Sequence, residues 1–382
     1  MDHHPARKIL VVSHEYPPIG GGGGRVIQDL CEGLASENLT FYILTAHYAD
    51  LSQIETHEFL TIERLRSCRK EAFRASLTAM VCFVWKSFWR TLRLIHTWNP
   101  VLIHAHFAVP GGASAALAAM ITRTPYILTI HGGDVPGGAP EKTDRWFRII
   151  KPFTGFIWKR ANKVIAVSEV SKQLALKHYP VEIEIIPNGI DRHVFQNDPA
   201  KLQTPPHILF VGRFSPEKNA IAVPDILKNL LDLDWKCTMI GDGPHWSLLE
   251  QRIKQFNLDE RFNLTGWLPQ DSVNSLLSNA DILMMPSLRE SMPMAGLQAL
   301  AAGNALILSN VGACPEMAVP GRNGFLFDPL DIEGFAQAVR ELLCDPDKLM
   351  EYKVHSRYIS KKFDIGLVLE KYRAIYREVL SK

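Results

Sequence analysis

The segment DILMMPSLRESMPMAGLQALAAG, residues 281–303, holds the pattern that decides the fold. It starts with a nearly continuous apolar run at residues 281–287, passes a turn that contains prolines, and continues as an apolar stretch suited to a helix. A strand that is apolar throughout is typical of a parallel sheet covered by helices on both faces. The segment therefore predicts one strand–helix unit of an α/β domain.

Similar units recur along the chain in two series. A polar, proline-bearing stretch, residues 196–207, separates the series and is interpreted as a linker. The fold class predicted is α/β, with two doubly wound Rossmann-like domains, residues 1–198 and 199–364, facing a central cleft. Residues 365–382 form a last amphipathic helix without a following strand, which we expect to pack back on the first domain. The strand candidates are residues 9–13, 41–46, 59–65, 101–106, 126–131, 163–168 and 182–187 in the first series, and 208–213, 236–241, 262–266, 281–287 and 305–309 in the second.

The composition limits what the chain can do. Its 382 residues, 47% apolar and 21% charged, are typical of a globular protein long enough for two domains. A net charge of +2 does not favour nucleic acid as a partner. The six cysteines include no CxxC pair, so we expect reduced thiols and no zinc site. Without a visible secretion signal or a stretch of membrane-spanning length, a cytoplasmic protein is expected.

The first series contains a glycine run at residues 20–24 that precedes a predicted helix. Glycines allow a ligand to approach the backbone, and the amides at a helix N-terminus suit a phosphate or a sugar. The alternative is a flexible loop without a ligand. The run lacks a GxGxxG pattern with a later acidic residue, which disfavours a nicotinamide cofactor.

Histidines lie at the ends of two predicted strands of the first series. His131 is followed by Gly132, Gly133 and Asp134, and we expect it to bind a sugar hydroxyl or to orient a second substrate, although a lone histidine is more often structural. A further pair, His104 and His106, alternates along the preceding strand. No third acidic or cysteine ligand accompanies this pair, so a metal site is not expected there.

The second series places charged residues after two strands. Arg213 and Lys218 follow the strand at residues 208–213 and suit a pyrophosphate, with solvated surface charge as the alternative. Glu290 follows the strand at residues 281–287, before a helix whose N-terminal amides suit a phosphate. Gln298, about two turns further on, is expected on the same side as Glu290. A plain crossover helix would give no reason for an acid beside an anion-binding helix end.

Taken together and in order, seven motifs resemble the GT-B glycosyltransferases of family 4 (glycosyl transferases group 1) over nearly the whole chain. They are the glycine run, ILTIHGGD before residue 135, IPNGID at residues 186–191, FVGRFSPEKN at 210–219, IGDGP at 240–244, LTGWLPQ at 264–270 and the segment around Glu290. The resemblance implies an acceptor-side first domain and a second domain that binds a nucleotide sugar. It implies catalytic roles for His131, at the reaction centre, and for Glu290, at the donor sugar. The implied donor contacts are Gly20, Gly21, Gly22, Arg213, Lys218, Ser291, Met292, Met294, Ala295, Gly296 and Gln298.

One residue departs from the family pattern. The family usually has a second glutamate where this chain has Gln298, and that glutamate commonly accepts hydrogen bonds from the donor ribose. A glutamine keeps one carbonyl acceptor and loses the charge. Weaker or altered ribose binding is therefore expected, and a loss of activity is one reading of the change.

The resemblance also implies the reaction. We expect retention of configuration, a UDP- or GDP-sugar as donor, a glycan or lipid-linked acceptor, and neither a metal nor another cofactor. A front-face displacement, in which the departing phosphate helps to deprotonate the acceptor, is the working mechanism. Two alternatives share the architecture: a nucleotide-sugar epimerase and a non-catalytic nucleotide-sugar-binding protein.

A basic and aromatic segment remains outside these motifs. Residues 64–93 contain eight basic residues against one acid, Glu71, and apolar residues recur there at helical spacing. One interpretation is a helix that lies in an anionic membrane interface. The other, slightly favoured, is a crossover helix whose apolar face packs on the first sheet and whose basic face is solvated. The basic residues are Arg64, Arg66, Arg69, Lys70, Arg74, Lys86, Arg90 and Arg93, and the apolar ones Leu77, Met80, Val81, Val84, Trp85, Phe88, Trp89 and Leu92.

Overall fold

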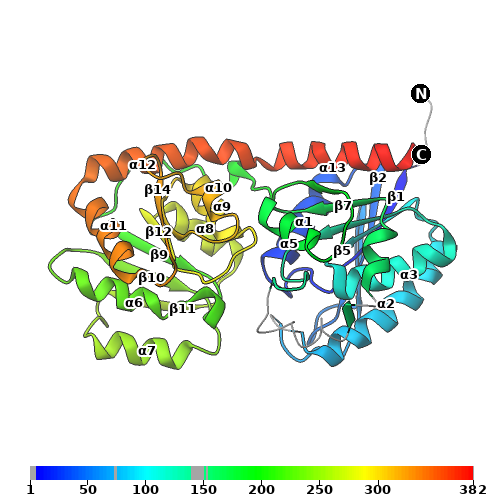
Figure 1. Cartoon of the computed structure of the whole chain (residues 1–382), viewed down its shortest axis with the longest axis horizontal. Coiled ribbons are helices and arrows are strands. Elements are labelled where there is room, and N and C mark those ends of the chain that lie inside the picture. The colour runs from blue at the N-terminus through cyan, green and yellow to red at the C-terminus, as the bar shows by residue number, and fades with distance from the viewer. Residues whose placement is uncertain (1–5, 73–74, 139–149, 152–153, 382) are drawn as a thin grey trace. The chain divides into compact units, whose positions relative to one another are not determined.

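The computed structural model describes residues 6–72, 75–138, 150–151 and 154–381, and it divides into two α/β units (Figure 1). The first unit is Met1–Asn188 with Val368–Lys382, and the second is Gly189–Leu367. The division comes before the predicted boundary at residue 198. Its cause is that the intervening residues bind the second unit: the Ile190 amide donates to the Phe363 carbonyl at 2.8 Å, and Arg357 donates to the carbonyls of Phe195 and Asn197.

The first unit is built on an eight-stranded sheet in the order β3-β4-β2-β1-β5-β6-β7-β8. All neighbours are parallel except β3, which pairs antiparallel with β4 at the edge. The sequence predicted seven of these strands and missed β3, whose letters IETH carry no apolar run. The strands are β1 (Arg7–Val12), β2 (Leu39–Ala46), β3 (Ile54–His57), β4 (Leu60–Leu65), β5 (Leu102–His106), β6 (Tyr126–Ile130), β7 (Lys163–Ala166) and β8 (Ile183–Ile185).

Helices cover both faces of this sheet (Figure 1). The C-terminal helix α13 belongs to this unit, although the last strand of the unit, β8, ends far earlier in the sequence. A Cβ on Gly33 of α1 would lie 2.6 Å from the Leu369 side chain of α13, so α1 and α13 are closely packed at this point. Glu378 of α13 forms a 2.9 Å ion pair with Lys163 of β7. The helices are α1 (Gly22–Leu34), α2 (Leu77–Thr97), a short turn η1 (Ala108–Gly112), α3 (Ala113–Thr122), α5 (Glu169–Leu176) and α13 (Ile365–Leu380).

Helix α2 packs on the sheet through a face that the sequence analysis did not select. Its buried residues are Ala79, Phe83, Ser87, Thr91 and Leu94. The predicted apolar stripe splits: Met80, Val84, Phe88 and Leu92 are half-buried, whereas Val81, Trp85 and Trp89 are exposed. The expectation that the whole stripe packs on the sheet is therefore wrong, because the buried face combines Phe83 and Leu94 with small and hydroxyl side chains. Arg74 lies outside the described residues.

The second unit has a fully parallel six-stranded sheet in the order β11-β10-β9-β12-β13-β14. Five strands were predicted, and the sixth, β14, was not. Its strands are β9 (His207–Val211), β10 (Lys236–Ile240), β11 (Phe262–Gly266), β12 (Ile282–Met285), β13 (Ala305–Ser309) and β14 (Gly324–Phe327). Its helices include α6 (Ala222–Leu227), α7 (Trp246–Gln255), α8 (Gln270–Ser278), α9 (Met294–Ala302), α10 (Cys314–Met317), α11 (Ile332–Cys344) and α12 (Pro346–Ile359), with the single turns η2 (Arg192–Val194), η3 (Pro216–Lys218), η4 (Lys228–Leu230) and η5 (Ser360–Phe363).

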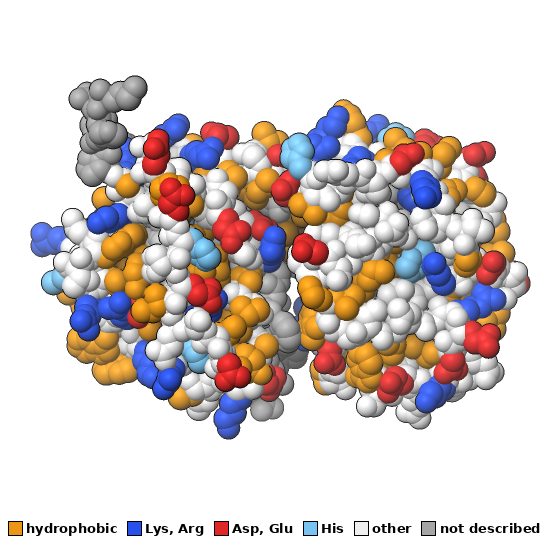
Figure 2. Space-filling view, turned by 180° about the vertical axis from the view of Figure 1, so that it is seen from behind, with side chains coloured by type: hydrophobic (Ala, Val, Ile, Leu, Met, Phe, Trp, Pro, Cys, Tyr) orange, Lys and Arg blue, Asp and Glu red, His pale blue; other side chains and the backbone are white. Residues whose placement is uncertain are grey.

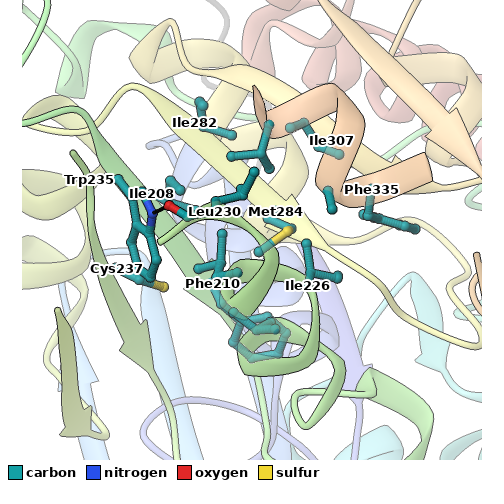
Figure 3. Close-up of a cluster of buried hydrophobic side chains, with 14 of the residues drawn as sticks. Ile208, Phe210, Ile226, Leu230, Trp235, Cys237, Ile282, Met284, Ile307 and Phe335 are labelled. Carbon is teal, nitrogen blue, oxygen red and sulfur yellow. Dashed lines mark hydrogen bonds between the residues drawn. The ribbon is translucent and has the colours of Figure 1, made fainter. Parts of the chain in front are cut away.

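The core of the second unit lies between the central strands and the helices on one face of the sheet (Figure 3). Phe210 of β9 and Met284 of β12 point into this cluster, together with Ile226 of α6 and Phe335 of α11. Trp235 is buried there, and its indole N–H is satisfied because it donates to the Leu230 carbonyl at 2.8 Å. This packing holds β9 and β12 side by side.

Each sheet reverses its strand order once, and the reversal fixes where a ligand would bind. In the first unit the chain passes from β1 to β2 and β4 on one side and returns to β5 on the other. In the second unit it passes from β9 to β10 and β11 and returns to β12. Open α/β sheets bind ligands at the carboxyl ends of the strands beside such a reversal. A ligand site is therefore expected at the carboxyl ends of β1 and β5 in the first unit and of β9 and β12 in the second.

The surface carries charges of both signs. Figure 2 shows acidic and basic side chains interspersed over the visible face of each unit. Within the described ranges, no helix combines the length and the apolar character needed to cross a bilayer.

Candidate active site

Two predicted residues of the second unit, Lys218 and Glu290, form an ion pair at the β9/β12 reversal. The Lys218 Nζ lies 2.7 and 2.8 Å from the two carboxylate oxygens of Glu290. The Ser287 hydroxyl donates to Glu290 Oε1 at 2.8 Å, and the Glu290 side chain is only 5% exposed. The loop after β9 and the loop after β12 are joined by their backbones as well, since the Leu288 amide donates to the Glu217 carbonyl.

Glycines hold the neighbouring loops against this pair. Gly241 and Gly243 follow β10 with φ of 145° and 155°, and a Cβ at either would overlap a carbonyl oxygen of the loop after β9. A Cβ at Gly312, after β13, would overlap the carbonyl oxygen of Glu290. The loops therefore pack backbone to backbone around the loops that carry Lys218 and Glu290.

Helix α9 begins directly after the candidate acid. It starts at Met294 behind Pro293, without a side-chain cap, so its first amides are not satisfied by a capping side chain. Met294 and Ala295 are half-buried, and a Cβ on Gly296 would lie 2.9 Å from the sulfur of Met317. Such a helix end suits an anion or the polar atoms of a sugar.

The helical-spacing argument for Gln298 does not apply, because α9 begins only at Met294. Glu290, Ser291 and Met292 lie in the loop before α9, so helical spacing does not place Glu290 and Gln298 on one side. Gln298 belongs to the second turn of α9 and is 7% exposed. Arg213 is half-buried in the loop after β9, as its place in the motif predicted.

The glycine run of the first unit is partly explained by a residue that the sequence analysis missed. Gly20 has a φ of 97°, and a Cβ there would meet the Glu15 side chain at 2.6 Å. Glu15 Oε2 accepts from the Gly21 amide at 3.1 Å, so a carboxylate already lies at the N-terminal end of α1. A second anion would be repelled there, which favours sugar hydroxyls over phosphate as ligands of Gly20, Gly21 and Gly22.

His131 lies beside this run. A Cβ on Gly23 would come within 3.7 Å of His131 Cγ, and within 2.7 Å of the ring of Phe107, which follows β5. Asp134 fixes the backbone on both sides, accepting from the amides of His131 at 3.0 Å and Ala108 at 2.6 Å. The β1/β5 reversal thus brings the glycine run and His131 together.

Burial controls the charge of these groups. It lowers the pKa of His131 to about 4, with a smaller opposing effect from Glu15, so the ring is neutral at physiological pH. It raises the pKa of Asp134 to about 6, against the lowering effect of the backbone hydrogen bonds. A neutral imidazole offers one donor and one acceptor, which suits hydrogen bonding to a sugar.

A chain of histidines extends from His131 to the C-terminal helix. His131 Nε2 lies 3.2 Å from His106 Nδ1, and His104 bonds the hydroxyls of Tyr376 and Thr129, each at 2.8 Å. Both ring nitrogens of His104 thus have uncharged partners, and burial lowers its pKa to about 3. In the part of the chain that the structure describes, no group of three or more His, Cys, Asp or Glu side chains is placed to hold a metal ion.

Comparison with known proteins agrees with this arrangement. Residues 20–194 match the family described as Glycosyltransferase Family 4, and residues 191–358 match Glycosyl transferases group 1. An uncharacterized glycosyltransferase of Methanocaldococcus jannaschii is 25% identical over 372 residues, which cover 97% of this chain and 98% of that protein.

Solved structures share the fold over nearly the full length. Sucrose-phosphate synthase from Thermosynechococcus elongatus superposes with a TM-score of 0.82 at 19% identity, covering 98% of this chain and 99% of that one. Anabaena HepE, solved with UDP-glucose, gives a TM-score of 0.78 at 19% identity, covering 97% and 99%. With two family matches that together run from residue 20 to residue 358 and two sheets of the GT-B type, the chain belongs to family 4 of the GT-B glycosyltransferases.

Proposed function

We propose that the protein transfers a hexosyl or related glycosyl group from a nucleoside diphosphate sugar, such as a UDP- or GDP-sugar, to an acceptor with retention of configuration. The observation that carries this proposal is the Lys218–Glu290 pair between the loops after β9 and β12, directly before the N-terminus of α9. A cation, a carboxylate and free helix amides at one position match a diphosphate joined to a sugar. The solved complex of a structural relative with UDP-glucose supports the donor class.

The charges of the second unit suit the departing diphosphate. Cleavage of the bond between the anomeric carbon and the phosphate oxygen leaves an extra negative charge on the diphosphate. Lys218 has three N–H donors, so it can keep Glu290 and also bind a phosphate oxygen. Arg213 and the first amides of α9 add fixed positive charge, which needs no reorganisation during the reaction. These groups supply the stabilisation without requiring a metal.

Glu290 is proposed to bind the donor sugar. Its carboxylate can accept hydrogen bonds from sugar hydroxyls while Lys218 and Ser287 hold it in place. His131 of the first unit, neutral and next to the glycine run, can bond a hydroxyl of the transferred sugar or of the acceptor.

Retention is proposed to follow a front-face displacement. The bond from the anomeric carbon to the diphosphate breaks, the bond to the acceptor oxygen forms on the same face, and the acceptor proton passes to the departing phosphate oxygen. No side chain of the chain is assigned as a covalent nucleophile. Trapping a glycosyl–enzyme adduct by mass spectrometry would overturn this mechanism.

The test begins with donor binding and ends with the product. A thermal-shift screen of nucleoside diphosphate sugars identifies the donor, because a ligand that binds only the folded state raises Tm. The bound donor is then incubated with glycan and lipid-linked acceptors, and the anomeric configuration of the product is read by NMR. A product of retained configuration in the presence of a chelator supports the proposal.

Two outcomes would support the alternatives. Epimerised sugar formed from donor alone would indicate a nucleotide-sugar epimerase. Donor binding without turnover on any acceptor, and without hydrolysis, would indicate a binding protein. The glutamine at position 298, in place of the usual glutamate, is the observation that favours this alternative.

We propose a cytoplasmic location because nucleotide sugars are supplied there.

A further inference from the structure

Helix α2 has an outward face that carries large exposed apolar side chains. Val81, Trp85 and Trp89 recur every four residues along this face and are 59%, 63% and 53% exposed. The rings of Trp85 and Trp89 contact each other edge to face, with centroids 5.6 Å apart. Two indoles so exposed are unusual on a surface that only meets water, because each leaves a large apolar area in contact with water.

The charges on the same face are positive. Helix α2 contains three basic residues and no acid. Arg90 is neutralised by Glu63 at 2.8 Å, whereas Lys86 and Arg93 are exposed and take part in no ion pair among the described residues. Arg66 and Lys70, in the segment before the helix, are also exposed and form no ion pair within those residues. The only acid of that segment is Glu71.

We propose that this face, defined by Val81, Trp85, Lys86, Trp89 and Arg93 and called the α2 face, docks on a membrane surface that contains anionic lipids. Indole rings prefer the boundary between headgroups and acyl chains, where the apolar ring and the N–H are both satisfied. Lysine and arginine beside them are attracted to anionic headgroups. A second copy of the chain fits less well, because a symmetric contact would place Lys86 and Arg93 of one copy against those of the other without an acid between them.

The position of α2 relates this docking to the first unit's candidate site. Phe83, on the inward face of α2, packs edge to face on the ring of His14, and His14 packs on Phe107 beside His131. The α2 face lies on the opposite side of the same helix, about 10 Å away, the diameter of a helix with its side chains. A membrane on this face would bring lipid-linked acceptors to the candidate site. This last step rests on the proposed function, whereas the docking itself does not.

The experiment is sedimentation with vesicles of phosphatidylcholine alone and of phosphatidylcholine mixed with phosphatidylglycerol. We expect binding to the anionic vesicles at low salt, little binding to the neutral ones, and loss of binding near 1 M salt, where the screening length is about 3 Å. Lys86→Gln with Arg93→Gln should weaken vesicle binding by roughly thirtyfold, about fivefold for each basic residue. Trp85→Gln with Trp89→Gln should abolish it.

Matched controls come from the second unit. Trp267→Gln removes an exposed indole, and Lys254→Gln with Lys362→Gln removes two exposed lysines. These variants should bind vesicles as the wild type does. All variants should keep the wild-type donor-induced rise in Tm, so that a failure of docking is separated from a failure of the donor site. No binding to anionic vesicles at low salt, or binding unchanged in both α2 variants, would overturn the proposal. A lipid-free dimer lost in the tryptophan variant would also overturn it, in favour of a second copy.

Discussion

Lys218 and Glu290 lie 72 positions apart in the chain, yet the Lys218 Nζ sits within 2.8 Å of both carboxylate oxygens of Glu290. The pair exists because β9 and β12 are neighbours at the strand reversal, so the loops that follow them meet at one edge of the sheet. Each residue neutralises the other in the structure described. A diphosphate that binds here therefore shares the positive charge of Lys218 with Glu290.

Because the charge of Lys218 is shared, one substitution should have opposite effects on catalysis and on nucleotide binding. Glu290→Ala should lower kcat strongly, because the contact with the donor sugar is lost. The same substitution leaves Lys218 without its counter-charge, so we expect UDP or GDP alone to bind as tightly as before or more tightly. Isothermal titration of the nucleotide, beside steady-state kinetics, measures both. Full activity of Glu290→Ala would remove the residue from the site.

The two cations should act on the diphosphate. A hydrogen bond to a charged group is worth about 1.5 to 3 kcal/mol, so Lys218→Ala or Arg213→Ala should reduce kcat/KM about tenfold or more. Arg213→Lys should be intermediate, because it keeps the charge and loses the fork geometry. Arg322→Ala, at an exposed position after α10, is the matched control and should leave the kinetics unchanged. Wild-type kinetics in both alanine variants would contradict the assignment.

Gln298→Glu tests the departure from the family pattern. The restored carboxylate should bind the donor with equal or higher affinity, since it offers more acceptor capacity to the ribose. Position 298 is 7% exposed, so an unpaired carboxylate there should also lower the stability of the ligand-free protein. We therefore expect a lower Tm without donor and a larger rise in Tm with it. A smaller rise than in the wild type would separate Gln298 from ribose binding.

Most strands could be predicted because they are buried on both faces and are therefore apolar throughout. The strand β3 could not, since its residues Ile54–His57 form a polar edge that pairs with one neighbour only. Lys218 and Glu290 were found because each follows an apolar strand. Their ion pair was not, because adjacency of β9 and β12 depends on the order of the strands in the sheet.

The first unit shows the same limit. The glycine run and His131 stood out as motifs, whereas Glu15 and Asp134 have no local pattern that reveals their backbone partners. The alternation of His104 and His106 was the one signal for the histidine chain, and it was read only as a test for metal. For α2, hydrophobicity alone misled the analysis. The face that packs on the sheet contains Ser87 and Thr91, and the tryptophans point outward.

The buried histidines predict that the protein loses stability in mild acid. Burial lowers the pKa of His14 and His131 to about 4 and that of His104 to about 3, and it lowers the pKa of His106 well below its usual value. An unfolded chain protonates histidine near pH 6.5. Between pH 6.5 and about 4 the unfolded state therefore binds more protons than the folded state, so the stability is fully present above pH 6.5 and falls as the pH is lowered.

The size of this effect can be measured by urea unfolding at a series of pH values. One histidine contributes a slope of about 1.4 kcal/mol per pH unit, and four contribute at most roughly 5. His104→Gln keeps hydrogen-bonding groups for Tyr376 and Thr129 and removes one titrating ring, so the slope should fall by about a quarter. The control is His57→Gln, on the exposed edge strand β3, which should leave the slope as it is. A free energy of unfolding that is constant from pH 6.5 to pH 5 would show that these rings are not held in neutral form in the folded protein.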